Sequence, residues 1–289
     1  MKKKACSLLI LLYSLFTFTC SSAPQPSVVE VNTSRYAALS QLEHANRAAN
    51  RGRFQEALFL LDEGRRLAIS ADDPSLRIRT SISRGDILFS LGHMDEAFSE
   101  WDSAAAEGDA SNLPVLAALA RIHTIRFSVL LIADGHTVGA GVNELRVELE
   151  RLLPPVRQDP MANAGWYITM SLAERQLERW SEAETAARRA LDIFDRNLSL
   201  EDSAYACFLI ASIRSLAGNY NAALDALRTS ISIDRRVENS YGLARSWQAT
   251  GDVYQKAGRV EDARMSWNRA AQIYRAIGFD DHAILLESR

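Results

Sequence analysis

Apolar and small residues recur along the chain in blocks that repeat about every 40 residues. Within each block a glycine is followed two positions later by an aromatic or apolar residue, and three positions after that by an alanine. One block, Arg179-Trp180-Ser-Glu-Ala183, lacks the glycine. The alanines are Ala57, Ala97, Ala183, Ala223 and Ala263. Their spacings are 40, 86, 40 and 40, and 86 is twice 43, so one further unit is expected between about 113 and 155. A fixed period of this length with helical spacing of apolar residues indicates a stacked helical repeat.

This period predicts six antiparallel helix pairs. We expect them at 35–70, 76–108, 113–153, 161–196, 201–236 and 240–276. The tail FDDHAILLES is expected to form a short helix that caps the last pair, because a terminal pair otherwise exposes an apolar face.

The third pair departs from the pattern. Pro114 suits the first turn of a helix that runs to about Ile132. A glycine-rich link, ADGHTVGAG, follows, and the second helix, from Val142 to Leu153, is expected to stop at the two prolines that come next. The link lacks a preceding strand and a following Lys-Ser/Thr, so a flexible connection is favoured over a phosphate-binding loop.

The last unit carries the clearest signature. Its small and aromatic residues are Trp247, Gly251, Tyr254, Gly258, Ala263 and Ala270. In type and order they resemble the tetratricopeptide repeat, in its longer form of about 40 residues, and the resemblance covers most of 35–280. It implies an all-α, right-handed superhelical solenoid of about six helix pairs. Gly251 and Ala263 are then packing residues that let paired helices approach closely. Gly258 is expected to adopt a left-handed backbone in the turn.

The amino terminus predicts export. Three lysines and an apolar run from Leu8 to Phe18 precede Cys20, and this run is too short to cross a bilayer as a helix. Cleavage by an ordinary signal peptidase would fall after Ala23. Pro24 would then follow the cut directly, which is a poor geometry for the protease. Cleavage before Cys20 resembles the processing of a bacterial lipoprotein, although Thr17-Phe18-Thr19 departs from that family's usual box. The alternative is a plain secreted protein.

The lipoprotein resemblance divides the chain into three parts. They are a signal peptide at 1–19, a tether at 20–34 with acyl chains on Cys20, and the repeat domain at 35–289. It also implies anchoring to a bacterial membrane, facing the periplasm. Removing the signal peptide leaves 30 basic residues against 36 acidic ones, a net charge of about −6. Nucleic acid is therefore not an expected partner.

The chain shows no catalytic constellation. Its five histidines are scattered, so no metal site is expected, and hydrolase and dinucleotide-binding motifs are lacking. Cys207 lies in the apolar run YACFLI and is interpreted as a small buried residue. We therefore expect neither an enzyme nor a cofactor.

The resemblance places candidate binding residues on the first helix of each pair, which lines the concave face in the tetratricopeptide family. Arginine, amide and tyrosine side chains there suit the backbone amides and carboxylates of a bound chain. The candidates are Arg79, Ser83, Asp86, Thr169, Arg175, Gln176, Tyr205, Phe208, Ser212, Arg245, Gln248 and Asp252. Of these, Phe208 is more simply interpreted as a core residue.

The expected function is a membrane-tethered scaffold or adaptor of the bacterial cell envelope that holds a protein partner in its groove. Two alternatives remain open. The protein could bind a small ligand and cooperate with the solute-binding component of a transporter, as some envelope lipoproteins of this repeat family are thought to do. It could also be a structural protein that self-assembles.

Overall fold

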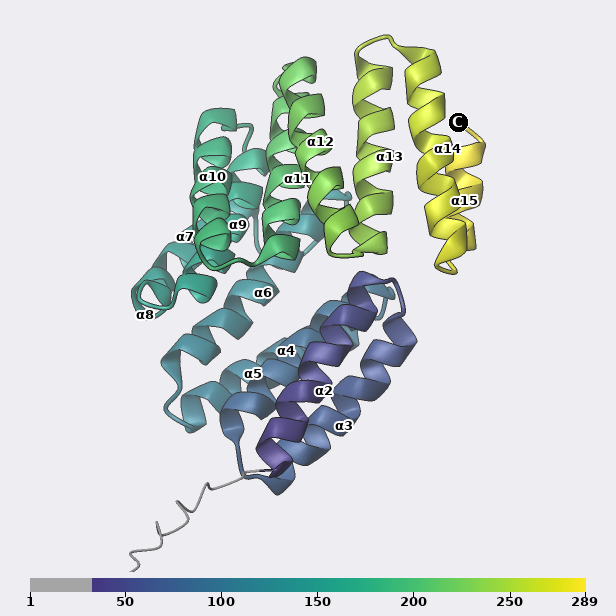
Figure 1. Cartoon of the computed structure of the whole chain (residues 1–289). Helices are drawn as coiled ribbons and strands as arrows, with labels where there is room; N and C mark the ends of the chain where they lie inside the picture. The colour runs from purple at the N-terminus through teal and green to yellow at the C-terminus, as the bar shows by residue number, and fades with distance from the viewer. Residues whose placement is uncertain (1–32) are drawn as a thin grey trace, which may run out of the picture. The chain divides into compact units, whose positions relative to one another are not determined.

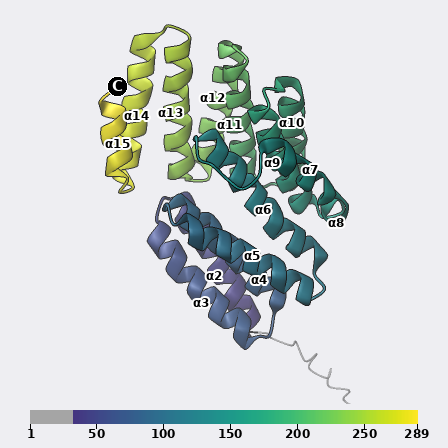
Figure 2. The same cartoon turned by 180° about the vertical axis from the view of Figure 1, so that it is seen from behind.

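The computed structural model describes residues 33–289, in which every regular element is a helix (Figure 1). The first helices of the six pairs are α2 (Thr33–Asn50), α4 (Pro74–Ser90), α6 (Pro114–Ala133), α9 (Pro160–Gln176), α11 (Leu200–Leu216) and α13 (Ser240–Lys256). The second helices are α3 (Phe54–Ser70), α5 (Met94–Ala110), α7 (Val142–Arg151) with α8 (Leu153–Val156), α10 (Trp180–Arg196), α12 (Tyr220–Arg236) and α14 (Val260–Ala276). Figure 2 shows the same helices from behind. The predicted all-α solenoid is confirmed. The predicted signal peptide and Cys20 lie outside the described residues.

The 40-residue period follows from the lengths of the elements. Each helix of the regular pairs after α2 has 17 residues, and each turn has three. The middle residue of a turn has a positive φ. Gly258 has φ +73°, which confirms its predicted left-handed backbone, while Leu198 adopts φ +56° without the freedom of glycine. In both turns the residue that follows donates its backbone N–H to a carbonyl of the preceding helix: Arg259 donates to Tyr254, and Ser199 donates to Phe194.

The small residues of the repeat lie where two helices of a pair touch. A Cβ added to Gly251 would lie 2.3 Å from Cδ1 of Trp267, and one added to Gly85 would lie 2.4 Å from Nε1 of Trp101. The alanine of the last unit, Ala263, is fully buried. The glycines and tryptophans therefore pack against each other, as the repeat pattern predicts for packing residues.

The third pair is irregular. Its first helix, α6, begins at the predicted Pro114 and is three residues longer than the preceding 17-residue helix, α5. Its second helix ends at Arg151, and the expected stop at the prolines is wrong. Pro154 and Pro155 lie within the one-turn helix α8, where a first-turn proline sacrifices no helical hydrogen bond.

Helix α6 is also long and apolar enough to cross a membrane by length and composition. More than half of its most apolar window is buried, and it packs against α5, α7 and α9. The apolar residues of α6 are therefore consistent with its packing among the other helices.

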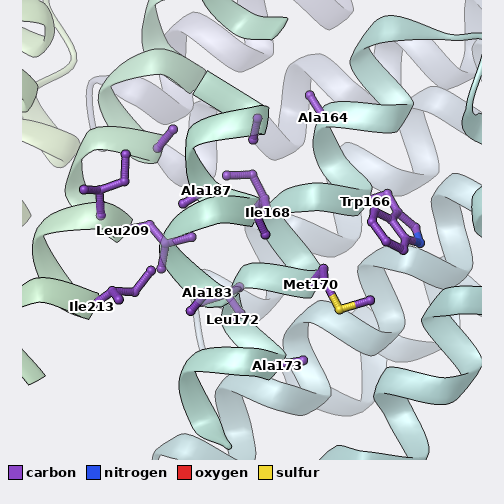
Figure 3. Close-up of a cluster of buried hydrophobic side chains, with 14 of the residues drawn as sticks. Ala164, Trp166, Ile168, Met170, Leu172, Ala173, Ala183, Ala187, Leu209 and Ile213 are labelled. Carbon is purple, nitrogen blue, oxygen red and sulfur yellow. The ribbon is translucent and has the colours of Figure 1, made fainter. Parts of the chain in front are cut away.

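The largest core runs from α6 to α13. Figure 3 shows side chains of α9, among them Ile168 and Leu172, next to Ala183 and Ala187 of α10 and to Leu209 and Ile213 of α11. Trp166 lies at one end of this cluster and donates its indole N–H to the carbonyl of Leu149, at 2.6 Å. A second cluster holds α13, α14 and the predicted capping helix α15 (Asp280–Glu287), which buries Ala283 and Leu286.

The first and last pairs meet. The ring of Phe54, at the start of α3, lies edge-on to the rings of Tyr241 and Phe279, at centroid distances of 5.2 and 5.5 Å. Beside this cluster, Arg51 forms a 2.6 Å ion pair with Glu238. We call these contacts the closing contact. The closing contact places the turn between α2 and α3 next to the starts of α13 and α15.

Candidate partner-binding groove

Three adjoining cavities, which we call the inner groove, lie along the first helices of the pairs. A cavity of about 200 Å³ between α11 and α13 shares Asn50, Glu201 and Asp202 with a cavity of about 540 Å³ that reaches α2 and α4. A third cavity, of about 410 Å³, shares Phe208, Tyr241 and Arg245 with the first and extends toward α15. Asn50 belongs to the first pair, so the groove is walled by both ends of the repeat array.

Arg245 lies at the junction of two cavities. Its guanidinium lies over the rings of Phe208, Tyr205 and Tyr241, at 4.8, 5.8 and 5.9 Å from their centroids. Such cation–π contacts hold a guanidinium without neutralising it. Among residues 33–289 no carboxylate lies within 4 Å of it, so its N–H donors can bind acceptors of a ligand.

Arg175 belongs to the same neighbourhood and is half-buried. Its Nη1 donates to Oγ of Ser212 at 3.0 Å. Burial lowers the pKa of Arg175, and the nearby Tyr205 and Asp134 oppose this effect. Its side chain therefore links α9 to α11.

Asp234, at the end of α12, is a buried carboxylate in the wall of the smallest cavity, with 2% of its surface exposed. It accepts a 2.7 Å hydrogen bond from Nδ2 of Asn239, whose own Oδ1 caps α13 through the N–H of Gly242. Burial raises the pKa of Asp234 to about 6, and the hydrogen bond from Asn239 opposes this rise.

Carboxylates predominate in the lining of the inner groove. Seven carboxylates stand against two guanidinium groups, those of Arg47 and Arg245. The seven are Glu43, Asp86, Asp134, Glu201, Asp202, Asp234 and Asp252. Within residues 33–289 only two of them have a basic partner: Asp86 bonds Nδ1 of His123 at 2.7 Å, and Asp252 bonds Nη1 of Arg289 at 2.8 Å. Burial also raises the pKa of Asp202.

The predicted binding residues are distributed unevenly. Seven of the twelve line the groove: Ser83, Asp86, Tyr205, Phe208, Arg245, Gln248 and Asp252. The other five do not line it: Arg79, Thr169, Arg175, Gln176 and Ser212. Three of the seven lining residues already have side-chain partners: Asp86 contacts His123, Gln248 accepts from the hydroxyl of Tyr274 at 3.2 Å, and Asp252 accepts from the indole of Trp267 at 3.0 Å. Phe208, interpreted as a core residue, is half-buried and lines two cavities.

Sequence reasoning missed Asp234, Glu201 and Asp202. A signal for Asp234 was present: it follows Leu227 and Ile231 by seven and three residues, so it occupies the buried face of its helix. Glu201 and Asp202 gave no such signal, because acidic residues are common in the first turn of a helix. Only the tertiary structure shows that these two acids, unlike those at other helix starts, line a cavity.

The remaining candidate chemistry is structural. Cys207 is 5% exposed and burial raises its pKa to about 11, which fits the interpretation as a small core residue. In residues 33–289 no group of three or more His, Cys, Asp or Glu side chains is arranged to hold a metal ion.

Residues 204–276, nearly all of α11 to α14, match the family model of the tetratricopeptide repeat. No curated protein sequence matches the chain. The chain is similar to the crystal structure of BtubC from P. vanneervenii, with 17% identity, a TM-score of 0.52, and coverage of 83% of this chain and 92% of that one.

Two further structures are similar. A Rap protein complexed with competence and sporulation factor has 14% identity and a TM-score of 0.56, with coverage of 87% of this chain and 69% of that one. The apo form of RapI has 12% identity and a TM-score of 0.52, with coverage of 87% and 70%. At these identities the likeness concerns the fold alone. Together with the family match, it supports a repeat protein of the tetratricopeptide type.

Proposed function

We propose that this helical-repeat protein, whose last two regular pairs match the tetratricopeptide repeat, is a membrane-tethered adaptor of the bacterial cell envelope. It binds a segment of a protein partner in the inner groove. The observation that carries the proposal is the groove itself: adjoining cavities on the first helices, lined by aromatic rings, by Arg245 and by seven carboxylates, five of which have no basic partner among residues 33–289. The Rap protein complexed with a factor provides an analogy for ligand binding on this fold.

The charge of the groove indicates the character of the bound segment. Five of its seven carboxylates have no basic partner among residues 33–289, so a lysine or arginine side chain is favoured next to Glu201 and Asp202. Arg245 then supplies N–H donors for backbone carbonyls of the same segment. Arg79, Arg175 and Arg245 are the arginines predicted to bind the backbone amides and carboxylates of a partner. Of these three, only Arg245 lines the groove.

The first experiment is co-purification of the tagged protein from native membranes in mild detergent, with partners identified by mass spectrometry. One stoichiometric protein partner is expected. The variant Glu201→Gln/Asp202→Asn should lose it. The control Glu261→Gln/Asp262→Asn should keep it, because these two acids occupy the same first-turn position in α14 and lie outside the groove. Equal loss in both variants would contradict the groove assignment.

Other outcomes favour the alternative functions. A folded protein that retains a metabolite in native mass spectrometry, and no protein partner, would indicate a ligand-binding accessory of a transporter. Sedimentation that depends on concentration would indicate self-assembly.

The tether is tested separately. Acylation of Cys20 predicts that fatty-acid labelling is lost in Cys20→Ser and retained in Cys207→Ser, since Cys207 is buried in the core. Unaltered labelling of Cys20→Ser would refute the anchor, and the groove assignment would stand independently.

A further inference from the structure

A cavity that is separate from the three cavities of the inner groove lies on α12, α13 and α14. We call it the arginine pocket. It has a volume of about 390 Å³ and shares no lining residue with the groove. Its lining includes Trp247, the apolar residues Leu224 and Ile231, and the basic residues Arg228, Arg235 and Arg269. Three of these side chains are basic and none is acidic, which reverses the charge of the groove within a chain of net charge −3.

Trp247 positions two of the arginines. The guanidinium of Arg269 lies 4.7 Å from the centre of its indole ring, and that of Arg235 lies 5.8 Å from it. A planar guanidinium over an aromatic ring keeps its N–H donors at its edge, directed away from the ring. The two side chains come from different helices, α12 and α14, so Trp247 on α13 holds guanidinium donors from two helices in one cavity.

The charges in this pocket are incompletely balanced. Arg228 pairs with Asp225 at 2.6 Å, outside the lining. Neither Arg235 nor Arg269 has a carboxylate within 4 Å among residues 33–289. Many other arginines of the protein are paired, such as Arg214 with Glu184 at 2.9 Å. Like charges that converge without a counter-ion repel one another, and a bound anion removes that repulsion.

The pocket also has an apolar wall. Leu224 and Ile231 are buried residues of α12, and Tyr254 is half-buried beside them. An anionic group can therefore bind at the arginines while the carbon skeleton of the same ligand contacts the wall. Arginine binds phosphate and carboxylate through paired, charge-assisted hydrogen bonds, which suits this arrangement.

We propose that the arginine pocket binds a phosphate-bearing ligand, with Arg235 and Arg269 holding the phosphate and Leu224, Ile231 and Tyr254 contacting its carbon portion. Two sources supply this chemistry: the headgroup of an anionic phospholipid and a free phosphorylated metabolite. The site is independent of the inner groove, and the proposal does not rest on a protein partner.

The test is calorimetric titration of the full-length protein in non-ionic detergent and phosphate-free buffer. The probes are inorganic phosphate, glycerol 3-phosphate and short-chain dihexanoyl phosphatidylglycerol. Saturable binding of glycerol 3-phosphate is expected, and Arg235→Gln/Arg269→Gln should weaken it by about tenfold or more. The matched control is Arg236→Gln/Arg264→Gln, which removes the same charge from the same two helices outside the pocket and should leave affinity within about twofold.

The outcomes separate the two sources. Tighter binding of dihexanoyl phosphatidylglycerol than of glycerol 3-phosphate identifies a lipid headgroup, and the reverse order identifies a free metabolite. Absence of saturable binding for all three probes, or equal weakening by both double variants, overturns the proposal. A further variant, Ser232→Glu, introduces a carboxylate into the wall and should abolish binding while a melting curve reports that the fold persists.

Discussion

Substitution of Gly251 by alanine is expected to destabilise the protein, although alanine is the better helix former. The added Cβ would lie 2.3 Å from Cδ1 and 2.4 Å from Nε1 of Trp267. The indole is 5% exposed and cannot retreat freely, because its N–H donates to Asp252 at 3.0 Å and the guanidinium of Arg289 lies over the ring at 5.4 Å.

The magnitude follows from three effects. Overpacking of a filled core costs about 1–3 kcal/mol, and a disturbed hydrogen bond costs about 1 kcal/mol. Removing a glycine from the interior of a helix contributes about 1 kcal/mol in the opposite direction. The free energy of unfolding should therefore fall by about 2 kcal/mol in Gly251→Ala.

Urea unfolding followed by circular dichroism measures this change, and two further glycines frame it. Gly85→Ala should show a similar loss, since its Cβ would lie 2.4 Å from Nε1 of the fully buried Trp101. Gly165→Ala is the control: its nearest neighbour would be Nη2 of Arg126, at 3.3 Å, so its stability should stay within about 1 kcal/mol of the original. A Gly251→Ala variant as stable as the original protein, or a control as damaged as Gly251→Ala, would refute the reasoning.

Three other predictions concern stability. Leu198→Gly should raise the free energy of unfolding by about 1 kcal/mol in the same assay, because Leu198 is 81% exposed at φ +56° and glycine relieves that strain without loss of packing. Ala263→Trp should lower the melting temperature through overpacking that costs about 1–3 kcal/mol or more, and an unchanged melting curve would contradict the packing role of this alanine. Burial raises the pKa of Asp234 from its ordinary value of 3.8 to about 6, so its destabilising effect develops as pH rises from 3.8 through 6 and is complete above that range. Asp234→Asn should therefore be more stable than the original by about 1–3 kcal/mol near neutral pH and by little near pH 4, and an equal gain at both pH values would contradict this reasoning.

The regular pairs could be predicted closely because their signals are local. Each regular pair consists of two 17-residue helices and two three-residue turns, so equivalent small residues recur every 40 residues. In the last pair, Gly258 marks the turn and Ala263 marks the contact between the helices. The prediction failed at Pro154, where proline was interpreted only as a stop, although it is equally suited to the first turn of a new helix.

The candidate groove was less accessible to sequence reasoning. Arg245 could be placed on the inner face from its repeat position, but the three rings around it come from α11 and α13 together. Glu43 and Glu201, on the first and fifth pairs, line one cavity although 158 positions separate them in the chain. No repeat pattern encodes such a juxtaposition, because the pattern describes neighbours and not the path of the whole array.

The closing contact has a consequence for how the protein folds. In a linear repeat array each unit contacts only its neighbours, so terminal units unfold independently and stability is close to a sum of local contributions. Here Phe54 contacts Tyr241 and Phe279, and the chain between them must be ordered before these rings can meet. Fraying of either end removes packing from the other end as well. Unfolding of the first pair and of the last pair should therefore be coupled, which gives a modular array some of the all-or-none cooperativity of a single-core domain.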